Sequence, residues 1–178
     1  MQSTAVRVLP DAVLWHEGML LAPQHFQQSD LRGEELLHYR LLAAAPFAWG
    51  VRRLRVDRGL MAQGTFRVTE LEAVLPDGVV ATVRADRDRP LQASLAGHEE
   101  AARRGELVVH LAVPAARSEG EPFAGGLARY DRIEGEPIPD DNTGDGEISI
   151  PRLRPRLTLI PGPAAPDTYV SLPLARPE

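Results

Sequence analysis

The spacing of hydrophobic positions changes once along the chain, at Pro46. In residues 23–45 the apolar side chains of Phe26, Leu37 and Leu41 fall near one face of an α-helix. A proline excludes helical geometry at the residue before it, so the helix should end just before Pro46. The pattern predicts one long helix over residues 23–45 that packs against the rest of the protein through these three side chains.

After Pro46 the apolar positions recur at every second residue, which is typical of half-buried β-strands. Such stretches, separated by glycine and proline, are residues 53–57, 65–68, 79–84, 107–113, 148–160 and 169–175. Pro151 and Pro155 confine the fifth stretch to a sheet edge or a bulge, and the Asp-Gly pair in Leu75–Gly78 favours a tight hairpin turn. This spacing predicts a mainly β protein, an antiparallel β-sandwich with one long N-terminal helix, as a single domain over residues 1–178.

Residues 118–146 are rich in glycine, proline and acidic residues and predict a long loop. The acidic stretch Asp140–Glu147 suggests calcium binding, but an EF-hand-type loop starting at Asp141 would place Arg152 where a bidentate glutamate is needed. We therefore expect a turn that is capped by its own Asp and Asn side chains.

Three arginines, Arg152, Arg154 and Arg156, alternate along one strand face. They could bind an acidic partner surface, or they could form a charged edge that deters strand pairing between molecules. The sequence leaves both interpretations open. The candidate secondary interface combines them with four residues of the preceding loop, Asp140, Asp141, Asn142 and Asp145.

The composition narrows the classes of function. A net charge of −5 argues against nucleic acid as a partner, because phosphate binding relies on a basic surface. The chain has no cysteine, no apolar run as long as the roughly 20 residues of a membrane span, and no signal peptide. We therefore expect a cytoplasmic protein without direct membrane insertion.

The histidines do not have the spacing of metal ligands. His16-Glu17 begins like the HExxH motif of zinc proteases, but the second histidine position holds Leu20. His25 lies outside that spacing, and no Walker loop, dinucleotide fingerprint or nucleophile elbow occurs. We therefore expect no metal, no cofactor and no catalytic residue, and hence no enzyme.

The stretch Trp15–Gln28 reads WHEGMLLAPQHFQQ and strongly resembles the opening signature of the TssK family, the baseplate subunits of bacterial type VI secretion systems. Four later blocks resemble the family in the same order: Pro46–Val51, Leu75–Gly78, Asp140–Asp145 and Leu172–Arg176. Five ordered blocks over the whole chain are a more specific signal than any single motif.

The resemblance implies a β-sandwich similar to the shoulder domain of phage receptor-binding proteins, in a subunit that forms a homotrimer. It implies that this domain docks on the wedge proteins TssF and TssG. The family's C-terminal part, which we expect to lie beyond this chain, would link the baseplate to TssM and TssL of the membrane complex, at the inner face of the inner membrane. The alternative is a glycan- or receptor-binding β-sandwich module of phage-tail type, which should present a concave site lined with aromatic residues.

The partner-binding surface is expected around residues 15–28. Gln24, Gln27 and Gln28 supply neutral amides that both donate and accept hydrogen bonds, which suits an interface core from which charges are excluded. The other interpretation is an ordinary helix start that packs Phe26 and leaves the remaining residues in solvent. The full candidate set is Trp15, Glu17, Gln24, His25, Phe26, Gln27 and Gln28.

Overall fold

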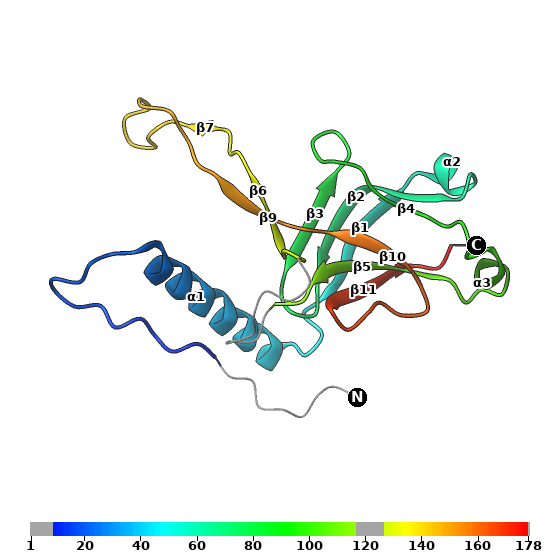
Figure 1. Ribbon diagram of the computed structural model, residues 1–178, viewed down its shortest axis with the longest axis horizontal. Coiled ribbons are helices and arrows are strands. Elements are labelled where there is room, and N and C mark those ends of the chain that lie inside the picture. Colours follow the sequence, from blue (N-terminus) through cyan, green and yellow to red (C-terminus); the bar gives the residue numbers. More distant parts are fainter. Residues whose placement is uncertain (1–8, 117–126, 178) are drawn as a thin grey trace. The chain divides into compact units, whose positions relative to one another are not determined.

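The computed structural model describes residues 9–116 and 127–177 (Figure 1). The chain divides into two compact units, Met1–Ala48 and Trp49–Glu178, and each is described here by itself. The first unit holds an extended segment followed by one helix. The second holds all the β-strands and two short helices.

Helix α1 spans Pro23–Ala44 and agrees with the predicted helix over residues 23–45 to within one residue. It contains no buried residue, and Phe26, Leu37 and Leu41 are 52%, 60% and 49% exposed. Within the first unit these three side chains are therefore not buried, and their packing against the rest of the protein stays a prediction. The helical neighbours between Phe26 and Leu37 on that face are polar or glycine: Ser29, Asp30, Gly33 and Glu34.

The first sheet of the second unit has four strands around one long central strand. They are β1 (Gly50–Val56), β2 (Thr65–Val74), β3 (Val80–Arg84) and β4 (Leu91–Ser94). All pairs are antiparallel, and β2 pairs with β1, with β3 and with β4. Because β3 and β4 pair with successive parts of β2, the outer edge of β3 has no strand beside it in the described chain.

The second sheet has three antiparallel strands. The central strand β5 (Val108–Pro114) lies between β10 (Thr158–Gly162) and β11 (Tyr169–Ala175). Two short helices, α2 (Arg58–Met61) and α3 (Glu99–Arg103), lie in the connections between strands. The prediction of a mainly β, antiparallel fold with one long N-terminal helix is confirmed.

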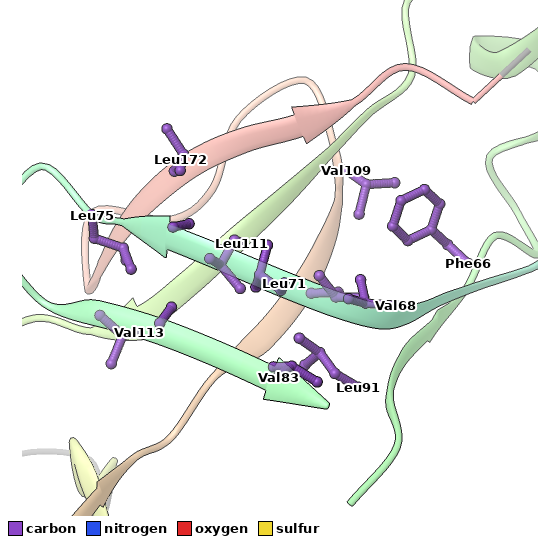
Figure 2. Packing of buried hydrophobic residues seen from close by; sticks show 13 residues of the cluster. Phe66, Val68, Leu71, Leu75, Val83, Leu91, Val109, Leu111, Val113 and Leu172 are labelled. Carbon is purple, nitrogen blue, oxygen red and sulfur yellow. The ribbon is translucent and has the colours of Figure 1, made fainter. Parts of the chain in front are cut away.

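One hydrophobic cluster joins the two sheets (Figure 2). Leu71 enters it from the first sheet, and Leu111 and Leu172 enter it from the second. Leu111 is completely buried because it lies on β5, the central strand of its sheet. His110, its neighbour on the other face of β5, is also buried, at 8% exposure, and neither of its ring nitrogens has a hydrogen-bond partner among the described residues.

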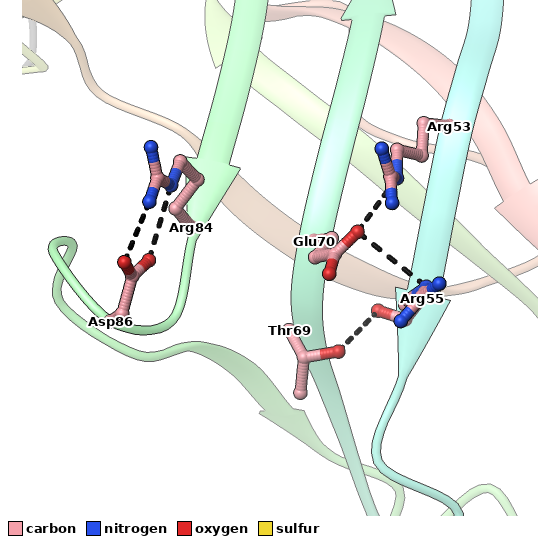
Figure 3. Close-up of polar contacts among 6 residues, drawn as sticks. All are labelled: Arg53, Arg55, Thr69, Glu70, Arg84 and Asp86. Atoms are coloured by element: carbon pink, nitrogen blue, oxygen red, sulfur yellow. Dashed lines mark hydrogen bonds and ion pairs between the residues drawn. The ribbon is translucent and has the colours of Figure 1, made fainter.

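Polar side chains link β1 to β2 on the surface of the first sheet (Figure 3). Arg53 and Arg55 both pair with the carboxylate of Glu70, at N–O distances of 2.6 and 3.5 Å. Thr69 donates its hydroxyl proton to the carbonyl oxygen of Arg55 at 3.1 Å. Solvent-exposed ion pairs of this kind each stabilise a fold by only about 0–1 kcal/mol, so the core dominates stability.

Residues 129–156 form a two-stranded arm of the second unit, drawn yellow to orange in Figure 1. Strand β6 (Tyr130–Ile133) pairs with β9 (Arg152–Pro155), and β7 (Pro137–Ile138) pairs with β8 (Ile148–Ser149). Three residues separate β6 from β7 but only two separate β8 from β9, which creates a one-residue bulge. Gly135 lies at this bulge, where a Cβ atom would collide with the carbonyl oxygen of Ile150.

This arm takes the place of much of the loop predicted over residues 118–146. Residues 118–126 lie outside the described residues, and the rest contains β6 and β7. Each of these strands is too short to show a period of two, and pairing with β8 and β9 is what holds them extended. The stretch predicted as a strand over residues 148–160 is divided into β8, β9 and β10, and its prolines lie in the arm or next to it.

Candidate partner-binding surface

The extended segment before α1 folds back along the helix within the first unit. The chain reverses at Gly18, whose φ of +78° lies in the left-handed region that favours glycine. On the far side of this reversal, Trp15 contacts the first turn of α1, and Arg32 farther along the helix donates a hydrogen bond to the carbonyl oxygen of Pro10. The segment therefore runs antiparallel to α1.

Trp15, His25 and Phe26 form an aromatic group at the start of α1. The ring centroids of Trp15 and His25 are 6.2 Å apart, and those of Trp15 and Phe26 are 6.0 Å apart, with interplanar angles of 53° and 50°. Tilted rings at these distances attract one another. Trp15 and Phe26 still remain about half exposed. The group therefore anchors the segment while it leaves apolar surface available to a partner.

His25 also closes the start of the helix. Pro23 occupies the first turn, where its missing N–H costs nothing. Ala22 at the N-cap has no side chain that can cap, but its backbone N–H donates to Nδ1 of His25 at 3.0 Å. Nδ1 of His25 is therefore occupied within the chain, which makes this residue a structural support of the candidate site.

The three glutamines of the candidate set, Gln24, Gln27 and Gln28, are exposed on the first turns of α1, and Glu17 is exposed beside the Gly18 reversal. Two leucines of the same unit, Leu14 and Leu20, are almost fully exposed. We call the seven candidate residues, Trp15, Glu17, Gln24, His25, Phe26, Gln27 and Gln28, the N-terminal surface. It combines neutral amides with large apolar groups, as interface cores do.

The tip of the arm is a turn capped by an Asp side chain, as the sequence predicts, whereas the Asn142 side chain forms no hydrogen bond with a described residue. The Oδ1 atom of Asp140 accepts hydrogen bonds from the backbone N–H groups of Asn142 and Thr143, both at 2.9 Å, and from the Thr143 hydroxyl at 3.3 Å. These bonds, first of all the one from the Thr143 N–H, hold the pKa of Asp140 below its ordinary value. Asp141 and Asp145 remain exposed on this turn.

We call the three alternating arginines, Arg152, Arg154 and Arg156, the arginine stripe, and two of them form ion pairs within the second unit. Arg154 forms an ion pair with Asp88 at 3.0 Å, and Nε of Arg156 donates to Asp131 at 2.9 Å. Arg152 lies on β9 and is exposed. Strand β9, which carries Arg152 and Arg154, belongs to a two-stranded ribbon and is therefore an edge, which fits the charged-edge interpretation.

The structure thus brings together only some of the residues that were predicted to form the secondary interface. The tip residues share one turn, whereas Arg154 and Arg156 are paired at the base of the arm. The sequence offered no signal for the partner of Arg154, because the ion pair joins positions far apart in the chain. In the residues that the structure describes, no three His, Asp or Glu side chains come together as a metal site. None of the described helices is both long and apolar enough to cross a lipid bilayer.

Comparison with known proteins decides the family. A family model described as bacterial type VI secretion, with the names EvfL, ImpJ and VasE, matches residues 25–177. The chain belongs to this type VI secretion family. A relative from Pseudomonas aeruginosa, the type VI secretion system baseplate component TssK1, is 36% identical over 137 residues, which cover 73% of this chain and 29% of the relative. The resemblance to the TssK family is thereby confirmed, and the chain spans less than a third of that relative.

Solved structures from the type VI secretion family agree with the fold. A crystal structure of TssK has a TM-score of 0.78 and 25% identity, and covers 94% of this chain and 38% of its own. A baseplate complex of the type VI secretion system has a TM-score of 0.73 at 22% identity, with 94% and 54% covered. The TssK-TssF-TssG baseplate subcomplex, solved by cryo-electron microscopy, has a TM-score of 0.69 at 22% identity, with 93% and 55% covered.

Proposed function

We propose that this chain is the docking domain of a type VI secretion baseplate subunit, and that the N-terminal surface binds the wedge proteins TssF and TssG. The observation that carries the proposal is the aromatic group at the start of α1. Trp15 is held by ring contacts with His25 and Phe26, yet it stays half exposed beside solvent-facing glutamines. A fixed, partly exposed tryptophan loses little side-chain entropy on binding, which is why such residues become binding hot spots.

Two observations support TssF and TssG as the partners. One solved relative of this fold is a subcomplex of TssK with TssF and TssG. In addition, the first unit taken by itself exposes ten large apolar side chains: Leu14, Trp15, Leu20, Leu21, Phe26, Leu31, Leu37, Tyr39, Leu41 and Phe47. A partner that covers these side chains would supply the burial that α1 lacks here.

The remaining parts of the proposal concern the assembly. The subunit would act as a homotrimer in the cytoplasm, at the inner face of the inner membrane, as an adaptor without catalytic activity. The link to the membrane proteins TssM and TssL would be made by the portion of the longer relatives that the matched 29% leaves out. A glycan-binding role has less support, because the only aromatic residue that lines the two clefts identified in the described chain is Tyr130.

The test is the affinity of the purified chain for a TssF–TssG complex from the same organism. Gln24→Ala combined with Gln28→Ala should weaken binding about tenfold if both amides face the partner, with an unchanged melting temperature. Gln63→Ala is the matched control, because Gln63 is an exposed glutamine on the connection between α2 and β2. If the double variant binds as tightly as the parent chain at equal stability, the interface lies elsewhere, and the tip of the arm is the next surface to test.

A further inference from the structure

The outer edge of β3 presents unpaired backbone groups. Ala85, just beyond the strand, donates its N–H to the Thr69 carbonyl at 2.9 Å, so odd-numbered residues of β3 point their backbone groups toward β2. Even-numbered residues therefore point theirs outward. Val80 and Thr82 are both exposed, and neither has a hydrogen-bonding partner on this outer side within the described chain.

The end of the same edge is closed by its own turn. The N–H of Arg84 donates to Oδ2 of Asp88 at 2.7 Å, and the Arg84 carbonyl accepts from the N–H groups of Arg87 and Asp88 at 3.0 and 2.8 Å. Arg84, which also pairs with Asp86 at 2.7 Å (Figure 3), therefore has no backbone group left for another strand. The open part of the edge is limited to Val80–Thr82, which is long enough for a short added strand.

A groove of about 410 Å³ lies along this edge. One wall is β3, and the others are the turn at residues 88–91 and the base of the arm, including Asp131 and Arg154. Its two carboxylates are engaged, since Asp88 pairs with Arg154 at 3.0 Å and Asp131 accepts from Arg156 at 2.9 Å. Arg89 also lines the groove, is exposed, and forms no ion pair with any described residue. The groove thus retains an uncompensated positive charge.

We propose that the open edge of β3 binds an extended segment of a partner protein, which adds as a strand beside Val80–Thr82 and places a carboxylate against Arg89. Backbone N–H and C=O groups at a sheet edge are matched by another extended backbone, and main-chain hydrogen bonds then supply the affinity. The free guanidinium of Arg89 selects an acidic side chain at one end of the added strand. The edge of β3 shares no residue with the N-terminal surface, and this proposal does not depend on what the N-terminal surface binds.

The experiment measures amide hydrogen exchange by NMR on the full chain, with the peptide acetyl-Glu-Val-Thr-Val-Glu-amide as the probe. It has an extended, β-branched centre and a carboxylate at each end, so either strand direction can reach Arg89. Saturating peptide should slow exchange at the amides of Val80 and Thr82 but not at those of Ala81 and Val83, which already face β2. The same peptide with N-methylated backbone amides should give no protection. Absence of protection by the unmodified peptide overturns the proposal.

Three variants separate the contribution of the backbone from that of the charge. Thr82→Pro removes an N–H that points away from β2, so it should weaken peptide binding about tenfold while the melting temperature stays near that of the parent. Arg89→Glu should also weaken binding, whereas Arg87→Glu, an exposed arginine of the same turn outside the groove, should not. If the two charge reversals weaken binding equally, the peptide responds to the net charge of the protein and not to Arg89, which overturns the assignment to Arg89. Concentration-dependent protection without peptide, together with a doubled mass, would show that β3 pairs with a second copy and would overturn the proposed partner strand.

Discussion

Arg129 and Asp77 form an ion pair that fastens the base of the arm to the turn between β2 and β3. The two side chains are only 14% and 23% exposed. Arg129 also donates to the carbonyl oxygen of Pro114 at 2.6 Å, and Asp77 accepts from the N–H of Val79 at 3.3 Å. One carboxylate thus shapes a hairpin turn and holds the residue at which the arm begins.

The first prediction concerns this pair. Asp77→Asn keeps an oxygen that accepts from the Val79 N–H but removes the charge opposite Arg129. The variant should lose about 1–3 kcal/mol of unfolding free energy, because a largely buried guanidinium is left without its counter-ion. Denaturant unfolding measures the loss.

Asp86→Asn is the matched control, because it removes the partner of Arg84 in an ion pair in which both side chains are more than half exposed. It should leave the unfolding free energy almost unchanged. Equal losses in the two variants would mean that burial does not distinguish the pairs. A double-mutant cycle with Arg129→Met should show coupling between positions 77 and 129.

The second prediction compares two leucines. Leu111 is completely buried at the centre of β5, whereas Leu41 on α1 is 49% exposed. Leu111→Ala should destabilise the fold by about 2–5 kcal/mol because it leaves a cavity. Leu41→Ala should cost less than about 1 kcal/mol in the isolated chain, since half of its side chain remains in water. A loss above 2 kcal/mol for Leu41→Ala would show that α1 is packed in solution and would confirm the face predicted from the sequence.

The sequence predicted the sandwich well where the signal is local. The Asp-Gly turn at Leu75–Gly78 has the expected geometry, with Gly78 at a φ of +91° and the Gly78 N–H bonded to the Leu75 carbonyl at 2.9 Å. The alternation of residues 107–113 likewise gave β5. The arm was missed because β6 and β7 are held extended by pairing with β8 and β9, and that pairing is not encoded in the local pattern of either strand.

The same distinction applies to the candidate surfaces. Pro23 predicts where α1 starts. The capping role of His25 could not be predicted, because an imidazole nitrogen at the third helical residue is an unusual substitute for a capping side chain at the N-cap. The arginine stripe was visible as an alternation. Its partners Asp88 and Asp131 were not, since ion pairs between distant positions leave no mark on spacing. The partners of these side chains could therefore be identified only from the fold.

The last prediction concerns the tip of the arm and its dependence on pH. Asp140 accepts three hydrogen bonds within its own turn, and they hold its pKa below the ordinary value of about 3.9 for an Asp side chain. A lowered pKa in the folded state means that the carboxylate stabilises the turn at every pH above the unfolded value. This contribution is lost as the pH falls through the folded value. The turn should therefore be intact at neutral pH and open only in acid.

NMR titration of the backbone amides of Asn142 and Thr143 tests this directly. Their chemical shifts should move together, with a midpoint below about pH 3.9, and Asp140→Asn should abolish the movement because the amide does not titrate. A midpoint at or above the ordinary value would contradict the capping geometry. If the turn is intact at neutral pH, Asp141 and Asp145 are presented from a fixed backbone. Charge reversal at those two positions then tests the tip as a docking surface without disturbing the turn itself.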